Sequence, residues 1–222
     1  MASIELPHAP GDLLALAVSY LLGAVPFGLV LIRLVRGVDL RTIGSGNIGA
    51  TNAMRAGGKP LGLLVFALDC LKGWAAVAWI APGLGAAGPE GLDALGVGCG
   101  AAAVLGHCFP AYLRFRGGKG VATACGALVA LDPRVFLAGG AVWLVVAALT
   151  RYVGLASIGM GAGFLAAAWL LDAAERPELV VGAALLFALI LARHRSNISR
   201  MLAGTEPKAF SARSRGGPGG AP

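Results

Sequence analysis

The sequence predicts an all-α integral membrane protein with seven transmembrane helices, an extracytoplasmic N-terminus and a cytoplasmic C-terminus. Of its 222 residues, 57% are hydrophobic and only 13% are charged, against about 25% charged in a typical soluble domain. The mean hydropathy is +0.78. The apolar residues fall in blocks of roughly 17–25 residues separated by short charged segments, which is the pattern of membrane-spanning helices.

Seven apolar blocks follow one another, and each is expected to form one helix. Pro26 is expected to kink the first, because proline removes a backbone donor. The fourth has too few residues to cross about 30 Å at about 1.5 Å per residue. It therefore extends back to Gly117, tilts, or forms a broken helix packed within the protein. The sixth is expected to begin near Val153. The blocks cover residues 13–35, 61–82, 93–113, 121–131, 135–150, 158–171 and 179–192.

The distribution of basic residues fixes the expected orientation, because Lys and Arg collect in cytoplasmic loops. With the N-terminus outside, 15 of the 18 basic residues lie on the cytoplasmic side; Arg134 and Arg176 lie outside and Lys72 lies within a span. The net charge of +7 then reflects topology and not nucleic-acid binding. Residues 1–210 are expected to form a single transmembrane domain, and residues 211–222 a disordered tail.

A polar segment follows the first block. Residues 44–59 read GSGNIGATNAMRAGGK and contain five glycines, no acid and no aromatic residue. Small residues let the backbone approach a ligand, and free N–H groups beside a cation bind anions. We interpret the segment as a phosphate-binding loop, although a flexible surface loop has a similar composition. The N–H groups of Gly46 and Gly49 are expected to be open, and the candidate side chains are Ser45, Asn47, Thr51, Asn52 and Arg55.

Two further segments on the cytoplasmic side carry candidate ligands. The motif RFRGGKG places Gly117 and Gly118 before Lys119, which suggests main-chain amides and a point charge around an anion, although no complete Walker motif is present. His194 and Asn197 are three residues apart and share a helix face if the last span continues; the alternative is an interfacial basic cluster. Together these turns predict one pocket for anions at the lipid boundary.

Other polar residues are expected to be structural. Asp69 and Lys72 lie three residues apart within a span, where an ion pair is the simplest interpretation. Glu206 is expected to form a salt bridge, and His107 a structural hydrogen bond. No HxxxxD motif occurs, which argues against acyltransferases that use a His-Asp base. Asp39 is the only acid in the cytoplasmic loops, so neither a metal nor another cofactor is expected.

Four stretches resemble the bacterial acyl-phosphate:glycerol-3-phosphate acyltransferase family (PlsY). They are GSGNIGATNAMRAGGK at 44–59, DCLKG at 69–73, GHCFPAYLRFRGGKGVAT at 106–123 and NISRMLAGTEPK at 197–208. The resemblance implies a seven-span enzyme of the bacterial cytoplasmic membrane with its active site on the cytoplasmic face. It also implies transfer of a fatty acyl group from acyl phosphate to the 1-hydroxyl of glycerol 3-phosphate, giving lysophosphatidic acid and phosphate for phospholipid synthesis.

The resemblance also implies roles for individual residues. The catalytic positions are Ser45, Arg55, Lys119, His194 and Asn197. The phosphate-binding positions are Asn47, Gly49, Thr51, Gly117, Gly118 and Ser157. Glu206 matches the family's glutamate, for which a structural role is expected. The expected partners are acyl phosphate, glycerol 3-phosphate and membrane lipid, with no nucleic acid and no protein partner.

The sequence leaves alternatives for the proton acceptor, for the role of Ser45 and for the class of function. The proton acceptor is His194 or the phosphate of the acyl donor; the phosphate is favoured because a histidine between two arginines is less basic. Ser45 is expected to position or polarise a substrate, and a covalent acyl-serine is the less favoured alternative. An acyltransferase that uses acyl-CoA and a non-enzymatic carrier of phosphorylated metabolites also fit the basic loops. A carrier needs a polar path, for which only Asp69 and Lys72 lie clearly within a span.

Overall fold

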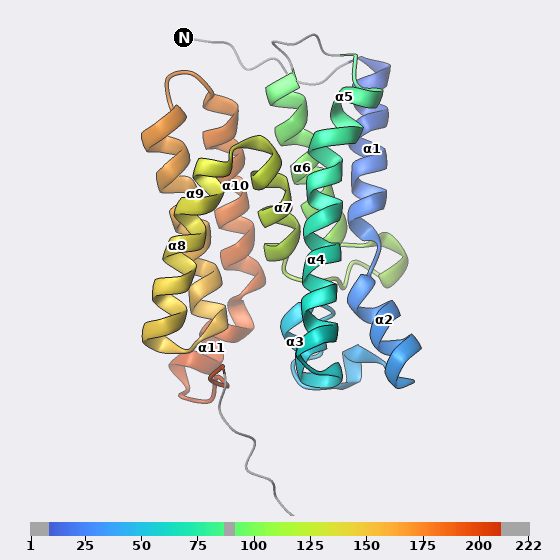
Figure 1. Cartoon of the computed structure of the whole chain (residues 1–222), viewed down its shortest axis with the longest axis vertical. Coiled ribbons are helices and arrows are strands. Elements are labelled where there is room, and N and C mark those ends of the chain that lie inside the picture. The colour runs from blue at the N-terminus through green and yellow to red at the C-terminus, as the bar shows by residue number, and fades with distance from the viewer. Residues whose placement is uncertain (1–8, 87–91, 210–222) are drawn as a thin grey trace, which may run out of the picture.

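The computed structural model describes residues 9–86 and 92–209, and all regular structure in these ranges is helical. Long helices stand alongside one another, with the start of α1 (Pro10–Ala24) at one end of the bundle and α11 (Arg195–Leu202) at the other (Figure 1). The predicted all-α architecture is therefore confirmed. The predicted tail, residues 211–222, lies outside the described residues.

The first apolar block is broken at Pro26, as predicted. Helix α1 ends at Ala24, Val25 leaves the helical region with ψ of 116°, and α2 (Phe27–Arg36) follows the proline. The polar segment beyond α2 contains a 3₁₀ turn, η1 (Leu40–Thr42), and a short helix, α3 (Ala50–Gly57). The glycine-rich segment 44–59 is therefore partly helical and is not a long irregular loop.

The remaining elements follow the predicted blocks closely. Prolines in the first turns of α1, α4, α8 and α10 suit these positions, where the missing N–H would have no partner. The second block is helical throughout: α4 (Lys59–Ala75), a π-helical turn η2 (Ala76–Ile80) and α5 (Ala81–Leu84). The rest are α6 (Leu92–Cys108), the 3₁₀ turn η3 (Ala111–Leu113), α7 (Val121–Leu131), α8 (Pro133–Thr150), α9 (Val153–Asp172) and α10 (Pro177–Arg193).

Membrane-spanning length is reached by most of the predicted blocks but not by all. Five helical segments in the described chain are long and apolar enough to cross a bilayer, and α10 with α11 forms a further candidate bent by 53°. Helix α7 has 11 residues and extends only about 16 Å. An integral membrane fold is supported, while the count of seven spans stays a prediction.

Helix α7 is enclosed by protein, which is one of the three arrangements expected for the short block. It begins at Val121 and does not extend back to Gly117. A side chain at Gly126 would overlap the carbonyl oxygen of Cys70, and one at Gly73 would overlap that of Thr123. The backbones of α4 and α7 therefore touch, and a helix surrounded by other helices need not match the bilayer thickness.

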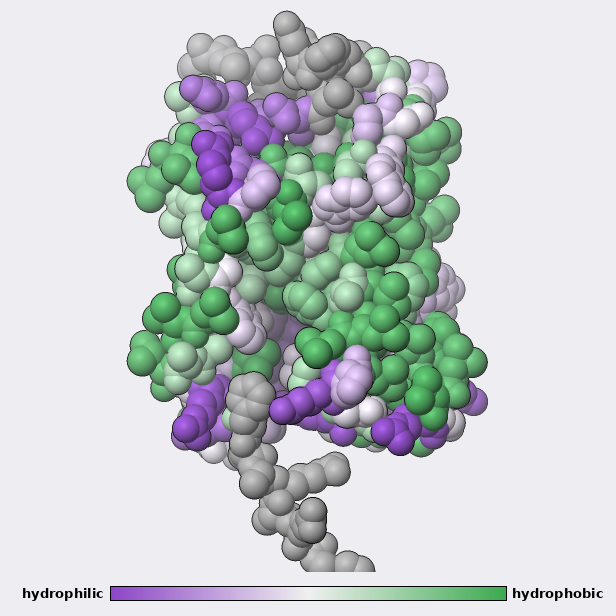
Figure 2. Space-filling model, viewed as in Figure 1, coloured by the Kyte–Doolittle hydropathy of each residue, from purple (hydrophilic) through white to green (hydrophobic). Residues whose placement is uncertain are grey.

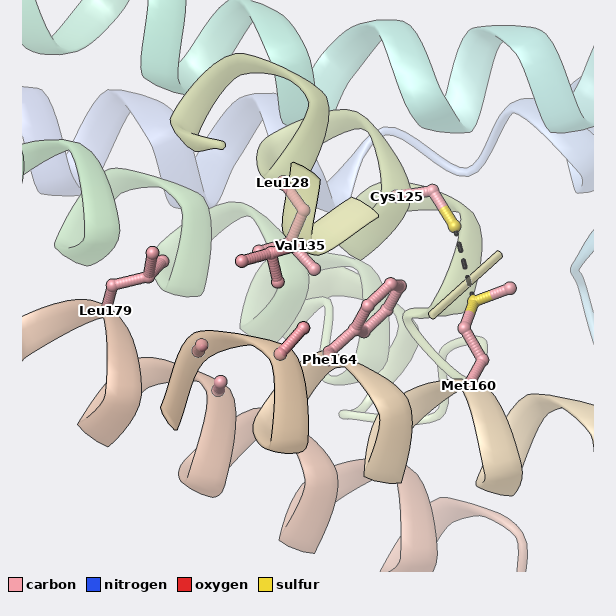
Figure 3. Packing of buried hydrophobic residues seen from close by; sticks show 9 residues of the cluster. Cys125, Leu128, Val135, Met160, Phe164 and Leu179 are labelled. Carbon is pink, nitrogen blue, oxygen red and sulfur yellow. Dashed lines mark hydrogen bonds between the residues drawn. The ribbon is translucent and has the colours of Figure 1, made fainter. Parts of the chain in front are cut away.

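The main apolar core lies between α7, α8, α9 and α10 (Figure 3). Phe164 on α9 is fully buried and packs with Leu128, Val135 and Met160. The Cys125 Sγ lies 3.7 Å from the Met160 Sδ, a contact that suits two polarisable sulfur atoms. All four cysteines are free thiols and three are buried, which agrees with their interpretation as small hydrophobic residues.

Charged residues collect at the two ends of the bundle, with an apolar belt between them (Figure 2). At the end that holds the α7–α8 connection, Arg134 contacts Asp172 at 2.8 Å and Arg176 contacts Asp93 at 3.1 Å. The opposite end carries the cations of α2, α3 and α11. Large apolar side chains such as Leu144 on α8, 65% exposed, form the belt, which suits contact with lipid.

Replacing Gly126 by alanine is expected to destabilise the protein, because the added Cβ overlaps the α4 backbone. Overpacking of this kind costs about 1–3 kcal/mol. Thermal unfolding of the purified protein in detergent measures the loss. Gly83→Ala is the matched control, since a Cβ there meets nothing within 4 Å. Equal unfolding temperatures for the two variants would contradict the close α4–α7 contact.

Candidate active site

The first polar loop is built around Asn52. Its side chain is buried, and its Nδ2 lies 3.0 Å from the Leu40 carbonyl oxygen and 2.9 Å from those of Ile43 and Asn47. Its Oδ1 accepts a hydrogen bond from the Ser45 N–H at 3.1 Å. Asn52 therefore shapes the loop and has no free group for a ligand, so its prediction as a candidate ligand is corrected.

The amides expected to be open in this loop are already paired. The Gly46 N–H donates to the Ile43 carbonyl at 3.0 Å, and the Gly49 N–H donates to Asn47 Oδ1 at 2.9 Å. The prediction of two open glycine amides was wrong, because the loop closes on itself through tight turns. Gly46 serves these turns with a φ of +67°, which glycine adopts without strain.

The exposed face of this loop carries the side chains that remain available. Ser45, Thr51 and Arg55 are exposed, and the last two lie four residues apart on one face of α3. The Arg55 Cδ lies beside Gly44, 3.9 Å from where a Cβ would stand. Helix α3 begins after Gly49 without a side-chain cap, and uncapped helix N-termini favour anions.

The amides of the second glycine pair, Gly117 and Gly118, are also bonded within the protein. The Gly117 N–H donates to the Cys108 carbonyl at 3.1 Å and the Gly118 N–H to the His107 carbonyl at 2.9 Å. A side chain at Gly118 would overlap the His107 ring. These glycines are therefore required by close packing against the end of α6, and the expectation that their amides bind phosphate is corrected.

Arg193 holds the carbonyl groups of the same segment, residues 117–120, which is called the glycine loop below. Its Nη2 donates to the Gly117 carbonyl at 2.9 Å, and its Nε and Nη2 donate to the Gly118 carbonyl at 3.0 and 2.8 Å. The guanidinium also lies 5.0 Å from the Phe109 ring centre. The sequence predicts only an interfacial cation here; a single arginine next to a histidine gives no signal of a partner 75 residues away.

Lys119 begins a chain of polar contacts that reaches the end of the described sequence. Its Nζ donates to Asn197 Oδ1. The Asn197 Nδ2 donates to Glu206 Oε1 at 2.6 Å, and the Arg200 Nε donates to Glu206 Oε2 at 2.7 Å. Asn197 and Glu206 are both buried. The predicted salt bridge of Glu206 is therefore present, and its partner is Arg200.

Helix α9 packs against Asn197 through its first turn. Gly154 lies so near Asn197 that an added Cβ would stand 2.9 Å from its Nδ2. Ser157 lies one turn further along and is buried, but its hydroxyl donates to the Val153 carbonyl at 2.9 Å. Its proton serves its own helix in this structure, and its assignment as a phosphate-binding residue stays a prediction.

The electrostatics of the site follow from burial among cations. Burial lowers the pKa of Lys119 to about 8; Glu206 opposes this shift, and the positive charges of Arg200, Arg55 and Arg193 add to it. Arg55 on α3 therefore acts on Lys119 across more than 60 residues of sequence. The structure thus brings the first loop, the glycine loop and the C-terminal helices to one strongly positive region.

His194 lies at the bend between α10 and α11. Burial, followed by the charge of Lys119, lowers its pKa to about 4, so the ring is neutral near pH 7. The Nδ1 lies 2.8 Å from the Ile190 carbonyl; we assign the proton to Nδ1, which leaves Nε2 as an acceptor. His194 and Asn197 were predicted to share one helix face only if the last span continued, and this condition is not met, because the helix bends by 53° between α10 and α11.

A buried triad lies beneath the glycine loop. The Lys72 Nζ lies 2.7 Å from Asp69 Oδ1 and 2.9 Å from His107 Nδ1, so the predicted Asp69–Lys72 pair is present. The same Nζ donates to the Val25 carbonyl at 3.1 Å, where the proline break removes the usual helical partner. The triad therefore links the kink of the first block to the histidine ring that supports Gly118.

Fold and site together define a class: a helical integral membrane protein whose clustered cations at one end suit anionic ligands. Comparison with known proteins identifies the particular family. The chain belongs to the glycerol-3-phosphate acyltransferase family, whose model matches residues 13–204. The predicted family and the predicted acyltransferase activity are therefore confirmed.

Individual relatives cover most of the chain. Glycerol-3-phosphate acyltransferase of Rhodospirillum rubrum is 50% identical over 191 residues, which are 85% of this chain and 87% of the relative. The enzyme of Sinorhizobium fredii is 45% identical over 203 residues, which are 90% and 93% of the two chains.

Two crystal structures of the integral membrane glycerol 3-phosphate acyltransferase PlsY (YgiH) have the same fold. The glycerol 3-phosphate form is 41% identical to this chain with a TM-score of 0.80. The lysophosphatidic acid form is 40% identical with a TM-score of 0.78. Each comparison covers 89% of this chain and 94% of the solved one.

Replacing Arg193 by lysine is expected to lower kcat/KM for glycerol 3-phosphate by roughly 10- to 100-fold. Lysine keeps the charge but loses the rigid fork that holds both glycine carbonyls, and hydrogen bonds from charged groups contribute about 1.5–3 kcal/mol each. Initial rates of lysophosphatidic acid formation measure the effect. Arg195→Lys, at an exposed neighbouring position, is expected to stay within about twofold. Equal effects of the two variants would contradict the role of Arg193.

Proposed function

We propose that this enzyme takes its acyl group from acyl phosphate and transfers it to the 1-hydroxyl of glycerol 3-phosphate, releasing lysophosphatidic acid and phosphate. The observation that carries this proposal is the half-buried Lys119, which shares one region with the charges of Arg55, Arg193 and Arg200. Both substrates are phosphates. Two such anions repel one another by several kcal/mol at low dielectric unless cations lie between them.

The cations of the site can orient the two substrates and neutralise their negative charge. Acyl phosphate is a mixed anhydride with a good leaving group, so catalysis rests on orientation and charge neutralisation. Arg55 offers a planar fork that matches a phosphate, while Lys119 offers a compact point charge. Ser45, which is exposed like Arg55, is assigned to positioning a substrate. Thr51, exposed on the same face of α3 as Arg55, is assigned to binding phosphate. Asn47 and Gly49 close the loop before α3 through the hydrogen bond between them.

The proton of the glycerol hydroxyl goes to the phosphate of the acyl donor in this proposal. His194 is the alternative acceptor, but with a pKa of about 4 it is a weak base near pH 7. A phosphate monoester has its second pKa at about 6, and the leaving phosphate lies next to the reacting hydroxyl. His194 Nε2 then accepts a hydrogen bond that orients a substrate, and Asn197 orients Lys119.

We further propose seven membrane crossings, an extracytoplasmic N-terminus and an active site on the cytoplasmic face of the bacterial inner membrane. The positive-inside rule supports this orientation, since the first loop, the glycine loop and α11 all carry basic residues. A single domain over residues 1–210, and function without a protein partner, metal or other cofactor, belong to the same proposal.

One experiment separates this proposal from its rivals. Purified protein is supplied with acyl phosphate and glycerol 3-phosphate, and lysophosphatidic acid is measured; acyl-CoA then replaces acyl phosphate. Product with acyl phosphate alone is expected. Product with acyl-CoA alone would overturn the assigned donor. A carrier would give no product with either donor; in the described residues the mid-bundle groups Asp69, Lys72 and His107 bond to one another and mark no open path.

The Lys119 pKa of about 8 predicts an alkaline loss of activity. Below pH 8 the ammonium is charged and neutralises substrate phosphate; above pH 8 the charge is lost, and kcat/KM falls toward tenfold per pH unit. Initial rates on both sides of pH 8 measure this fall. The Lys119→Arg variant stays charged and is expected to keep a flat profile there. The same fall in both proteins would show that another group titrates.

Replacing His194 by asparagine or alanine is expected to raise KM while kcat falls by less than about tenfold, because removal of a general base costs about 100- to 10,000-fold. Asparagine retains a donor for the Ile190 carbonyl and controls for damage to the helix bend. Steady-state rates at saturating substrates measure kcat. A loss of more than about 100-fold in both variants at saturation would make His194 the proton acceptor.

A further inference from the structure

The break in the first apolar block leaves two carbonyl groups without their usual helical partners. In a continuous helix the carbonyls of Ala24 and Val25 accept from the N–H groups of residues 28 and 29. Helix α1 ends at Ala24 and α2 begins only beyond Pro26, and neither of these two bonds is present in this described stretch. Within the backbone, the Val25 carbonyl accepts only from the Phe27 N–H, at 3.2 Å. The break therefore makes two strong acceptors available to other segments.

Both acceptors are bonded by side chains from elsewhere in the chain. The Tyr112 hydroxyl, on the 3₁₀ turn η3, donates to the Ala24 carbonyl. The Lys72 Nζ, on α4, donates to the Val25 carbonyl at 3.1 Å. These donors are 88 and 47 residues away from their acceptors in the sequence. The break in the first helix is therefore tied to two segments, and each of them leads to the glycine loop by a different route.

Tyr112 belongs to the connection, residues 109–116, that carries the chain from α6 into the glycine loop. This connection is bonded to α1 a second time, because the Tyr20 hydroxyl donates to the Phe109 carbonyl at 2.6 Å. It also contains two consecutive residues with left-handed backbone, Arg114 and Phe115, whose φ values are 53° and 60°. Residues other than glycine keep such a conformation only where the surrounding structure holds them. The connection therefore has a defined shape up to the start of the glycine loop.

Lys72 reaches the glycine loop through a histidine. Its Nζ lies 2.7 Å from Asp69 Oδ1, and a carboxylate neighbour favours the charged amine. An ammonium group has donors only, so His107 Nδ1, 2.9 Å from the Lys72 Nζ, is the acceptor and we assign the ring proton to Nε2. The ring occupies the space that a side chain at Gly118 would need. Lys72 thus orients the ring that lies against the residue before Lys119.

Resting on the proposed role of Lys119 as a phosphate cation, we propose that the break at Pro26 positions the glycine loop for catalysis, with Tyr112 and Lys72 as its positioning residues. The two carbonyls at the break hold the connection that precedes the loop and the histidine that lies beneath it. Lys119 is then kept beside Asn197 and within the field of the arginines. Neither positioning residue touches a substrate, because both act through the glycine loop.

The test measures kcat and KM for glycerol 3-phosphate in variants that remove one tie at a time. Tyr112→Phe loses only the hydroxyl, and kcat/KM is expected to fall about two- to tenfold, the contribution of one neutral hydrogen bond. Asp69→Asn combined with Lys72→Met removes the charged tie without leaving an unpaired buried charge, and a fall of roughly 10- to 100-fold is expected. Pro26→Ala restores a backbone donor and is expected to lower kcat/KM too, because a continuous helix bonds its own carbonyls.

Tyr152→Phe is the matched control for the loss of a hydroxyl group. The Tyr152 ring lies next to Lys208, and its hydroxyl has no hydrogen bond in the part of the chain that the structure describes. Its kcat/KM is expected to stay within about twofold of wild type. The form of the loss separates positioning from folding. A smaller folded fraction lowers the apparent kcat and leaves KM unchanged, whereas a displaced Lys119 raises KM for glycerol 3-phosphate.

The pH profile gives a second readout of the position of Lys119. Burial is the largest cause of its pKa of about 8. A displaced Lys119 is more hydrated, so its pKa rises toward its ordinary range and the alkaline loss of activity moves to higher pH; the loss of Glu206 as a neighbour acts in the opposite sense but is a smaller cause. These variants leave every charged or titratable group that acts on Lys119 in place, namely Arg55, Arg193, His194, Arg200 and Glu206.

The outcomes separate the positioning role from the function on which it rests. An unchanged KM together with an unchanged alkaline limb, in both Tyr112→Phe and the double variant, overturns the positioning role. Wild-type kcat/KM in Pro26→Ala overturns the role of the break. If the double variant fails to fold, Tyr112→Phe decides alone. A wild type without an alkaline loss near pH 8 contradicts the role of Lys119 instead, and product from acyl-CoA alone contradicts the donor; KM in the variants then decides the positioning role.

Discussion

A half-buried cation, Lys119, that must stay available to an anion is the constraint on which this site depends. A lysine in direct contact with a carboxylate is neutralised, and a lysine that loses part of its hydration without gaining a partner is costly. Asn197 resolves the conflict, because its carbonyl oxygen accepts from Lys119 while its amide group donates to Glu206. The carboxylate, further satisfied by Arg200, is kept one side chain away, and the region around Lys119 keeps its positive charge.

The glycine loop owes its geometry to groups on both of its sides. The His107 ring lies under Gly118 and is itself fixed by Lys72 and Asp69. The Arg193 guanidinium holds the carbonyls from the other side. Four charged or ionisable side chains are therefore used to place a short segment without a strong conformational preference of its own. These four side chains come from three helices, α4, α6 and α10, so the position of the loop depends on how these helices pack.

The architecture could be predicted because its causes are local in sequence. Long apolar blocks, the proline at position 26 and the basic loops each act on their own segment, and the elements follow them. The failures concern backbone pairing, which composition does not reveal. The Gly46 amide is bonded within a tight turn and the Gly117 amide is bonded to the end of α6. No proline or glycine next to His194 marks the helix bend. The role of Asn52 depends on backbone groups 5–12 residues away, and the role of Arg193 on carbonyls about 75 residues away. Neither set of partners can be read from the neighbouring sequence.

The short α7 has a consequence for how an insoluble substrate reaches the enzyme. Because α7 begins well above the lower ends of α4 and α8 (Figure 1), the connection that precedes it lies within the length of the bundle and not at its outermost edge. In the proposed reaction, a donor anchored in the leaflet therefore presents its reactive carbon by sideways diffusion. Its hydrocarbon tail then stays in the bilayer, and the cost of extracting it into water is avoided.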